Sequence, residues 1–398
     1  MSELSSEHIA LQEQILEAKA QGRILQIRGF GTKDFYHPLN PRLDTENLST
    51  QKLKGIINYE PSELFIQVAA GTSLQSVETL LHTHGQCLPF EPPRFIRPEK
   101  DALCSRDASI GGMVASGLSG PARASVGAVK DFILGAHLIN GQAEHMVFGG
   151  QVMKNVAGYD VSRVLASSMG TLGVITEVTL KVLPQPLGDL SLLAKMSAEE
   201  AQVLLLRLGQ LPLPLHSSTC VNPLSKVGHH ELDFTLRLKG ANAATQSALE
   251  RIQSELKALN REGMVLPQAN ALEHWERVRD QTHVFFSSPT SPTASLWRVS
   301  LPLKSLKLGV PSFAQESLTE WFGALHWVWA EATEILALQE EVARLKGSMD
   351  LWRTSEGTDR LRLQQFNTPI EANSLKLQTQ LQQAFDPSGV FKTGRAQP

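Results

Sequence analysis

Apolar residues in the first part of the chain alternate between helical and strand-like spacing. Over 9–18 they partly follow the period of an amphipathic helix, which Ser5 or Ser6 can cap and Gly22 can end. The other elements expected in this part are two strands and one helix, at 24–27, 64–68 and 74–81. Strands and helices thus share the N-terminal region.

A hairpin and a further strand are predicted before residue 186. Asn140 and Gly141 form the dipeptide most typical of a tight hairpin turn, and alternating strand residues flank it. Pro184 and Pro186 then interrupt the pattern, so we expect a domain boundary there. The strands are expected at 132–139, 144–148 and 173–180.

The second half of the chain also mixes the two periods. Helices are predicted at 201–208, 243–259 and 335–345, a strand at 233–238 and a loop at 287–291. We expect this half to form a cap domain of antiparallel strands and helices, which makes the whole chain α+β.

Composition describes a globular chain and excludes several classes of protein. The chain has 398 residues, of which 42% are hydrophobic and 19% charged, enough to build the core of two or three domains. A net charge of -3 without a dense basic run speaks against binding to nucleic acid. Glutamates 3, 7, 13 and 17 contradict a secretory signal, and no apolar run is long enough to span a membrane. We expect a cytoplasmic protein, peripheral to a membrane only through a partner.

The cysteines and histidines do not predict a metal site. The three cysteines, Cys87, Cys104 and Cys220, are too widely spaced for a disulfide framework or an iron–sulfur cluster. The pair His82 and His84 falls at a helix end, where histidine commonly favours the dipole. Residues 229–231, His-His-Glu, lack the spacing that directs two imidazoles to one ion, so we expect no metal.

Glycine-rich loops beside apolar segments are the strongest chemical signal. One loop, 28–33, leaves the end of a predicted strand, and further glycines follow between 105 and 182. Residues 109–115 can begin a short helix of small residues. Such backbone can approach a bulky anionic ligand, with ordinary turns as the alternative interpretation. The loop lacks the third glycine and the following helix of a Rossmann motif, so the ligand we expect is a dinucleotide bound in another way.

Several of these motifs together carry a family resemblance. They are Arg-Gly-x-Gly-Thr-Lys (28–33), Phe-Glu-Pro-Pro (90–93), the small-residue run 109–123, Gly-Gly-Gln-Val-Met-Lys-Asn-Val-Ala-Gly-Tyr-Asp (149–160) and Gly-Thr-Leu-Gly-Val-Ile-Thr-Glu-Val (170–178). The chain resembles FAD-binding domains of the vanillyl-alcohol oxidase, or PCMH, type, and within that group it is similar to the E subunits of glycolate oxidase. The resemblance covers about residues 20 to 186 and resumes at 297–302 and 385–395.

The resemblance implies a two-lobed PCMH-type FAD-binding domain over 1–186, a cap over 187–355 and a segment 356–398 that returns to the FAD domain. It implies that FAD is held by two glycine motifs, by a third loop, and more weakly by residues between them. The first set is Arg28, Gly29, Phe30, Gly31, Thr32, Lys33, Ser109, Ile110, Gly111, Gly112, Ala115, Ser116 and Gly117. The third loop supplies Gly170, Thr171, Gly173, Val174 and Ile175, and the weaker residues are Gly120, Arg123 and Gly127.

The sequence departs from its relatives in two informative places. Phe30 occupies a position that is commonly glycine, and no histidine follows at the position where some relatives attach flavin covalently. We therefore expect FAD to be bound non-covalently. The cap also lacks the histidine-rich motif of relatives that oxidise 2-hydroxy acids, so the catalytic residues stay unassigned.

The resemblance implies a FAD-binding subunit of a complex that oxidises glycolate to glyoxylate. Its implied partners are a homologous catalytic flavin subunit and an iron–sulfur subunit. Two alternatives are a self-sufficient flavin oxidase and a non-catalytic scaffold. The cap offers charged candidates, Arg277, Arg279, His283, Arg298, His326 and Arg353, and contains all six tryptophans, at 275, 297, 321, 327, 329 and 352. These tryptophans can indicate a protein interface, a core or a substrate pocket.

Overall fold

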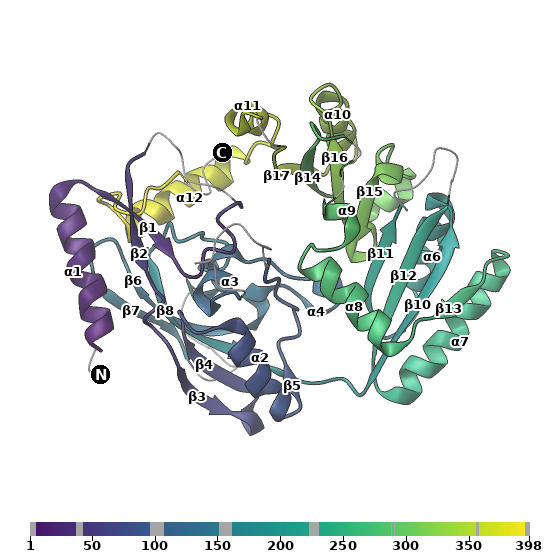
Figure 1. Ribbon diagram of the computed structural model, residues 1–398, viewed down its shortest axis with the longest axis horizontal. Helices are drawn as coiled ribbons and strands as arrows, with labels where there is room; N and C mark the ends of the chain where they lie inside the picture. The colour runs from purple at the N-terminus through teal and green to yellow at the C-terminus, as the bar shows by residue number, and fades with distance from the viewer. Residues whose placement is uncertain are drawn as a thin grey trace. The chain divides into compact units, whose positions relative to one another are not determined.

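The computed structural model describes two compact units (Figure 1). The residues it describes are 5–36, 43–95, 107–150, 161–222, 231–287, 289, 291–355 and 358–394. Unit 1 comprises 1–119, 128–185 and 370–398, and unit 2 comprises 120–127 and 186–369. The predicted domains differ from these units in two places. Residues 120–127 group with unit 2, and the return to unit 1 begins at residue 370 rather than 356.

Unit 1 is built on an antiparallel five-stranded sheet in the order β3-β4-β8-β6-β7. These strands are β3 (Ile56–Glu60), β4 (Phe65–Ala69), β6 (Ile133–Ile139), β7 (His145–Gly149) and β8 (Val174–Lys181). Two smaller sheets pair β1 (Ile24–Arg28) with β2 (Thr45–Ser49) in parallel, and β5 (Gln86–Cys87) with β9 (Leu183–Pro184). The apolar residues of β4, β6 and β8 form the main core of this unit.

Several helices of unit 1 show caps, although Ser5, expected to cap α1, precedes it without a side-chain cap hydrogen bond. The Ser109 hydroxyl caps α3 and accepts a hydrogen bond from the Gly112 amide, and Gly22 ends α1 with a left-handed φ of 65°. Apolar residues of α2 and α3 join the core of the sheet. The helices are α1 (Ser6–Gln21), α2 (Leu74–Thr83), α3 (Ile110–Ser116), α5 (Val161–Val164) and α12 (Ala372–Phe385).

The C-terminal segment is bonded into unit 1. The Leu25 amide donates to the carbonyl of Val390 at 2.7 Å, and the Gly141 amide donates to the carbonyl of Phe385 at 3.0 Å. The buried Asp386 carboxylate accepts hydrogen bonds from the amides of Val390 and Phe391. A Cβ on Gly141 would lie 2.1 Å from an Asp386 oxygen, so only glycine fits this hairpin turn against the segment.

Unit 2 contains an antiparallel eight-stranded sheet in the order β13-β10-β12-β11-β15-β16-β14-β17. The strands are β10 (Gly188–Met196), β11 (Leu215–Val221), β12 (Leu232–Gly240), β13 (Gly263–Val265), β14 (Ser295–Ser300), β15 (Ser317–Glu320), β16 (Leu325–Ala330) and β17 (Ser348–Arg353). Apolar residues of β10 (Leu192, Ala194, Met196) and β12 (Phe234, Leu236, Leu238) give the sheet a surface against which helices can be buried.

Two apolar clusters hold these helices to the sheet. Residues of α6 and α7 pack on β10 and β12, as Figure 1 shows, while α10 packs on β14, β16 and β17. The helices of unit 2 are α4 (Arg123–Val126), α6 (Ala198–Leu208), α7 (Asn242–Ala258), α8 (Gln268–Arg279), α9 (Val284–Ser287), α10 (Ile335–Arg344) and α11 (Arg360–Gln364). Together the two units give the chain the α+β class expected from its sequence.

The strongly periodic elements were predicted correctly. The expected strands over 24–27, 64–68 and 173–180 correspond to β1, β4 and β8, and the expected hairpin corresponds to β6 and β7. The expected helices correspond to α1, α2, α6, α7 and α10. Much of the cap sheet was not predicted, because short strands such as β13 and β15 carry too few residues to show a period.

Candidate nucleotide-binding site

The loop that leaves β1 turns so tightly that two of its glycines cannot be replaced without displacing neighbours. Gly31 has a left-handed φ of 74°, and a Cβ there would lie 2.5 Å from the Arg28 guanidinium. A Cβ on Gly29 would lie 2.1 Å from the Ser109 hydroxyl, which caps α3. The loop and α3 therefore approach each other through bare backbone. The amide of Asp34 closes the turn by donating to the carbonyl of Gly31 at 3.2 Å.

The second glycine motif lies at the beginning of α3. A Cβ on Gly111 would lie 2.8 Å from the Cβ of Ala70, so glycine allows α3 to pack directly on the chain that follows β4. The amide of Gly111 donates to the carbonyl of Ala70 at 2.7 Å. This packing fixes α3 beside the loop 28–33.

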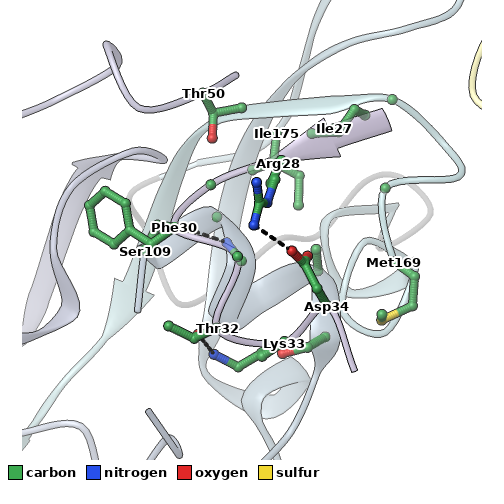
Figure 2. Close-up of a pocket in the computed structure, with 18 residues that line it drawn as sticks. Ile27, Arg28, Phe30, Thr32, Lys33, Asp34, Thr50, Ser109, Met169 and Ile175 are labelled. Atoms are coloured by element: carbon green, nitrogen blue, oxygen red, sulfur yellow. Dashed lines mark hydrogen bonds and ion pairs between the residues drawn. The ribbon is translucent and has the colours of Figure 1, made fainter. Parts of the chain in front are cut away.

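These segments enclose a cleft of about 700 Å³, open solvent at its mouth included (Figure 2). Most of the predicted FAD-contacting residues line it, together with residues that were not predicted. The predicted ones are Arg28, Gly29, Phe30, Gly31, Thr32, Lys33, Ser109, Gly111, Gly112, Ala115, Ser116, Gly170, Gly173 and Ile175. The others are Ile27, Asp34, Thr50 and Met169.

The unpredicted lining residues lacked a local sequence signal. Thr50 reaches the cleft because β1 and β2 pair in parallel, and its amide donates to the carbonyl of Arg28 at 3.1 Å. Met169 has a left-handed φ of 53°, unusual for a side chain of its size. Asp34 directly follows the glycine loop, so extending that motif by one residue would have included it.

Charged groups face each other inside the cleft. Figure 2 shows the Arg28 guanidinium directed at Asp34, with which it forms an ion pair of 2.8 Å. The Nε of Arg28 is buried and has no hydrogen-bond partner among the described residues. The Lys33 ammonium lies 3.5 Å from the Thr32 hydroxyl. Two cations, one with a buried unused N–H, and glycine backbone suit the phosphates of a dinucleotide.

Some predicted contact residues lie elsewhere. Ile110 and Val174 are fully buried in the cores of unit 1. Gly117 ends α3 with a left-handed φ of 62°, and the Thr171 hydroxyl donates to the carbonyl of Ser168 at 2.7 Å. Their roles in unit 1 are thus explained by packing and turns, and a contact with the cofactor remains a prediction for them.

The three weaker residues belong to unit 2. Arg123 begins α4 and stacks on Trp321, with its guanidinium carbon 4.6 Å from the ring centroid. The Trp321 indole donates to the carbonyl of Gly120 at 3.1 Å. Gly127 ends α4 with a φ of 104°. Each of these has a structural role within unit 2, and their predicted contact with FAD is untested.

The two candidate histidines of the cap are buried or partly buried, and His326 is already hydrogen-bonded. His326 is buried, with Nδ1 2.9 Å from the Thr319 hydroxyl and Nε2 3.1 Å from the carbonyl of Gly323. Burial lowers the pKa of His326 to about 4. Burial also lowers the pKa of His283. Neutral, satisfied imidazoles of this kind fit a structural role.

The cap arginines are mostly paired, and the cap tryptophans are mostly core residues. Arg277 and Arg279 form ion pairs with Glu273 and Asp280, and Arg353 donates to Gln281. Five tryptophans are buried, namely 275, 297, 321, 327 and 352, while Trp329 is partly buried. The interpretation as core residues therefore accounts for most of them.

In the described part of the chain, no three His, Cys, Asp or Glu side chains are grouped so that they could hold a metal ion. His84 instead contacts the Tyr59 ring, and His229, His230 and Cys104 lie outside the described residues. None of the helices in the described ranges is long and apolar enough to cross a membrane. The motif at 151–160 also lies outside the described residues.

Comparison with solved structures shows the fold. Alkyldihydroxyacetonephosphate synthase superimposes with a TM-score of 0.67 over 98% of this chain and 74% of that chain, at 12% identity. A second structure of that synthase gives a TM-score of 0.66 at 11% identity. The likeness to this synthase shows the fold of the chain.

Comparison with known sequences shows the family. Residues 7–149 match the family described as FAD binding domain. Glycolate oxidase subunit GlcE of Escherichia coli is 35% identical over 386 residues, which are 97% of this chain and 96% of that protein. D-lactate dehydrogenase of Anaerostipes hadrus is 27% identical over 146 residues, or 37% of this chain and 28% of that protein. The chain therefore belongs to the family of FAD-binding glycolate oxidase GlcE subunits, within the FAD-dependent oxidoreductases.

Proposed function

We propose that this protein is the FAD-binding subunit of a multi-subunit glycolate oxidase that converts glycolate to glyoxylate. The observation that carries the proposal is the match to subunit GlcE along nearly the whole of both chains. The cleft in unit 1 supports it independently, because its glycine backbone and cations suit a dinucleotide. The D-lactate dehydrogenases among its relatives support oxidation of a hydroxy acid.

The cleft residues would hold FAD without a covalent bond. The described residues that line the cleft include neither histidine nor cysteine. Arg28 and Lys33 would bind phosphate oxygens, and the glycines at 29, 31, 111 and 112 would let the backbone approach them. FAD, when bound, supplies the hydride acceptor for oxidation of the alcohol carbon.

The partners in this proposal are a homologous flavin subunit and an iron–sulfur subunit. A relative named glycolate oxidase subunit GlcD, from Bacillus subtilis, is 33% identical over 100 residues, or 25% of this chain and 21% of that protein. The names GlcE and GlcD denote two related subunits of glycolate oxidase, which supports an enzyme of several subunits. We assign the iron–sulfur cluster to a partner and place the complex in the cytoplasm, with membrane contact only through a partner.

Purification of the chain alone and with its partners tests this function. Bound flavin is released and measured, and the flavin absorbance is followed after anaerobic addition of glycolate. Our proposal expects flavin in the isolated chain, with bleaching only in the assembled enzyme. Bleaching of the isolated chain would support a self-sufficient oxidase instead, and a flavin-free chain that restores activity on assembly would support a scaffold.

A further inference from the structure

An arginine and an aspartate face each other across two strands of unit 2. Arg298 on β14 is the register partner of Asp350 on β17, so both side chains leave the same face of the sheet. The Arg298 guanidinium carbon lies 5.5 Å from the ring centroid of Trp321 and 6.0 Å from that of Trp327. Two indoles thus hold this guanidinium in place.

Among the described residues, neither charged group forms a hydrogen bond or ion pair. The Arg298 guanidinium instead lies over the two indole rings. The Asp350 carboxyl is near enough to feel the charge of Arg298 but forms no ion pair with it. Burial raises the pKa of Asp350, and Arg298 opposes that rise. Both side chains are only partly buried.

A second arginine–aspartate pair on the same sheet shows what a structural pair looks like here. Arg237 on β12 donates to both carboxylate oxygens of Asp189 on β10, at 2.9 and 2.7 Å. That bidentate geometry satisfies both groups and lowers the pKa of Asp189 despite its burial. The contrast indicates that Arg298 and Asp350 are not held together for stability. The N–H donors of the Arg298 guanidinium and the carboxylate oxygens of Asp350 are therefore available to a ligand, on neighbouring strands.

We propose that Arg298 and Asp350 form a binding site for a 2-hydroxycarboxylate. Arg298 donates to the carboxylate of the ligand, while Asp350 accepts a hydrogen bond from its hydroxyl group. The choice of a hydroxy acid rests on the proposed function, whereas the site itself rests on these two side chains. The planar fork of arginine matches a carboxylate, and the indoles fix its orientation.

The spacing of the pair selects this class of ligand. Cβ atoms of directly opposed residues lie about 4.5–5.5 Å apart, so the two polar heads can reach neighbouring carbons of one small molecule. A phosphate would bring several negative oxygens against Asp350, and a simple carboxylate would leave Asp350 unpaired. The guanidinium of Arg123 also lies over the Trp321 ring, and its positive charge further favours an anion.

Binding to the full-length, FAD-loaded protein tests the site. Saturation-transfer NMR measures the affinity for glycolate and for acetate, which lacks the hydroxyl. We expect Arg298→Met to weaken both ligands about tenfold or more, since each charged hydrogen bond contributes about 1.5–3 kcal/mol. Arg298→Lys should lose less than Arg298→Met, because it keeps the charge without the fork. Asp350→Leu should weaken glycolate several-fold and leave acetate unchanged.

Arg344→Met is the matched control, because Arg344 is exposed on α10 and pairs with Glu341. Equal losses in Arg298→Met and Arg344→Met would show general charge attraction and overturn the site, as would equal effects of Asp350→Leu on both ligands. Flavin content and glycolate bleaching in the assembled enzyme separate this inference from the proposed function. If glycolate binding depends on Arg298 but glycolate does not bleach the flavin of the assembled enzyme, only the proposed function is overturned. If glycolate does bleach the flavin but binds unchanged to Arg298→Met and Arg298→Lys, only the proposed site is overturned.

Discussion

Replacing Gly31 by alanine should weaken FAD binding in addition to lowering stability. A left-handed φ costs a residue with a Cβ about 1–2 kcal/mol. The new Cβ would also lie 2.5 Å from the Arg28 guanidinium, which must then move away from Asp34 and out of its place in the cleft. A charged hydrogen bond lost to phosphate is worth about 1.5–3 kcal/mol, so the dissociation constant should rise about tenfold to a hundredfold.

Gly22→Ala is the control for this prediction. Gly22 also has a left-handed φ, of 65°, but nothing lies within 4 Å of the Cβ that alanine would add. Gly22 ends α1 and does not line the cleft. Both variants should therefore lose about 1–2 kcal/mol of folding stability, and only Gly31→Ala should lose FAD.

Titration of flavin-free protein with FAD, followed by quenching of flavin fluorescence, measures the dissociation constants. Thermal unfolding of the flavin-free variants measures the shared cost of the backbone conformation. The reasoning is refuted if Gly31→Ala binds FAD as tightly as the wild type, or if Gly22→Ala weakens FAD to the same extent. The first result would mean that the loop 28–33 does not bind FAD. The second would mean that the loss of FAD affinity in Gly31→Ala comes from general destabilisation.

Two further predictions concern stability. Gly141→Ala should detach the C-terminal segment, because the new Cβ would displace Asp386. The midpoint of urea unfolding should then move to a lower urea concentration. An unchanged midpoint would contradict the contact between Gly141 and Asp386. Burial lowers the pKa values of His274 and His326 to about 4 from 6.5, so unfolded chains bind more protons as pH falls below about 6.5. Stability should be full above pH 7 and fall by about 1 kcal/mol per histidine by about pH 5.5. His326→Gln should flatten this loss in urea titrations, whereas identical slopes would refute the assignment.

Local signals explain how much of the site could be predicted. The loop 28–33 and the glycines of α3 were recognisable because their chemistry lies in contiguous residues. Thr50 was not, because only the pairing of β1 with β2 brings it to the cleft. Register across strands is set by packing and turns over long sequence separations, and a single sequence does not show it. The position of Arg298 opposite Asp350 in the sheet was not predicted for the same reason.

The cap tryptophans show a second limit of sequence reasoning. An interface, a core and a pocket all favour large aromatic residues, so composition left three interpretations open. The structure separates them through burial, since Trp297 and Trp352 are almost fully inaccessible. Trp321 combines two roles, because it is buried and also contacts the guanidiniums of Arg123 and Arg298. Such a dual role depends on neighbours in three dimensions, and the spacing of residues along the sequence does not show it.

The return of residues 370–394 to unit 1 determines the order in which the protein can mature on the ribosome. All of unit 2 is synthesised before the segment that bonds to Leu25 and Gly141 emerges. The cap can therefore fold first, while the flavin-binding unit waits for the last part of the chain. Premature termination of translation before residue 370 would release a polypeptide with the whole cap but without the segment that bonds to Leu25 and Gly141.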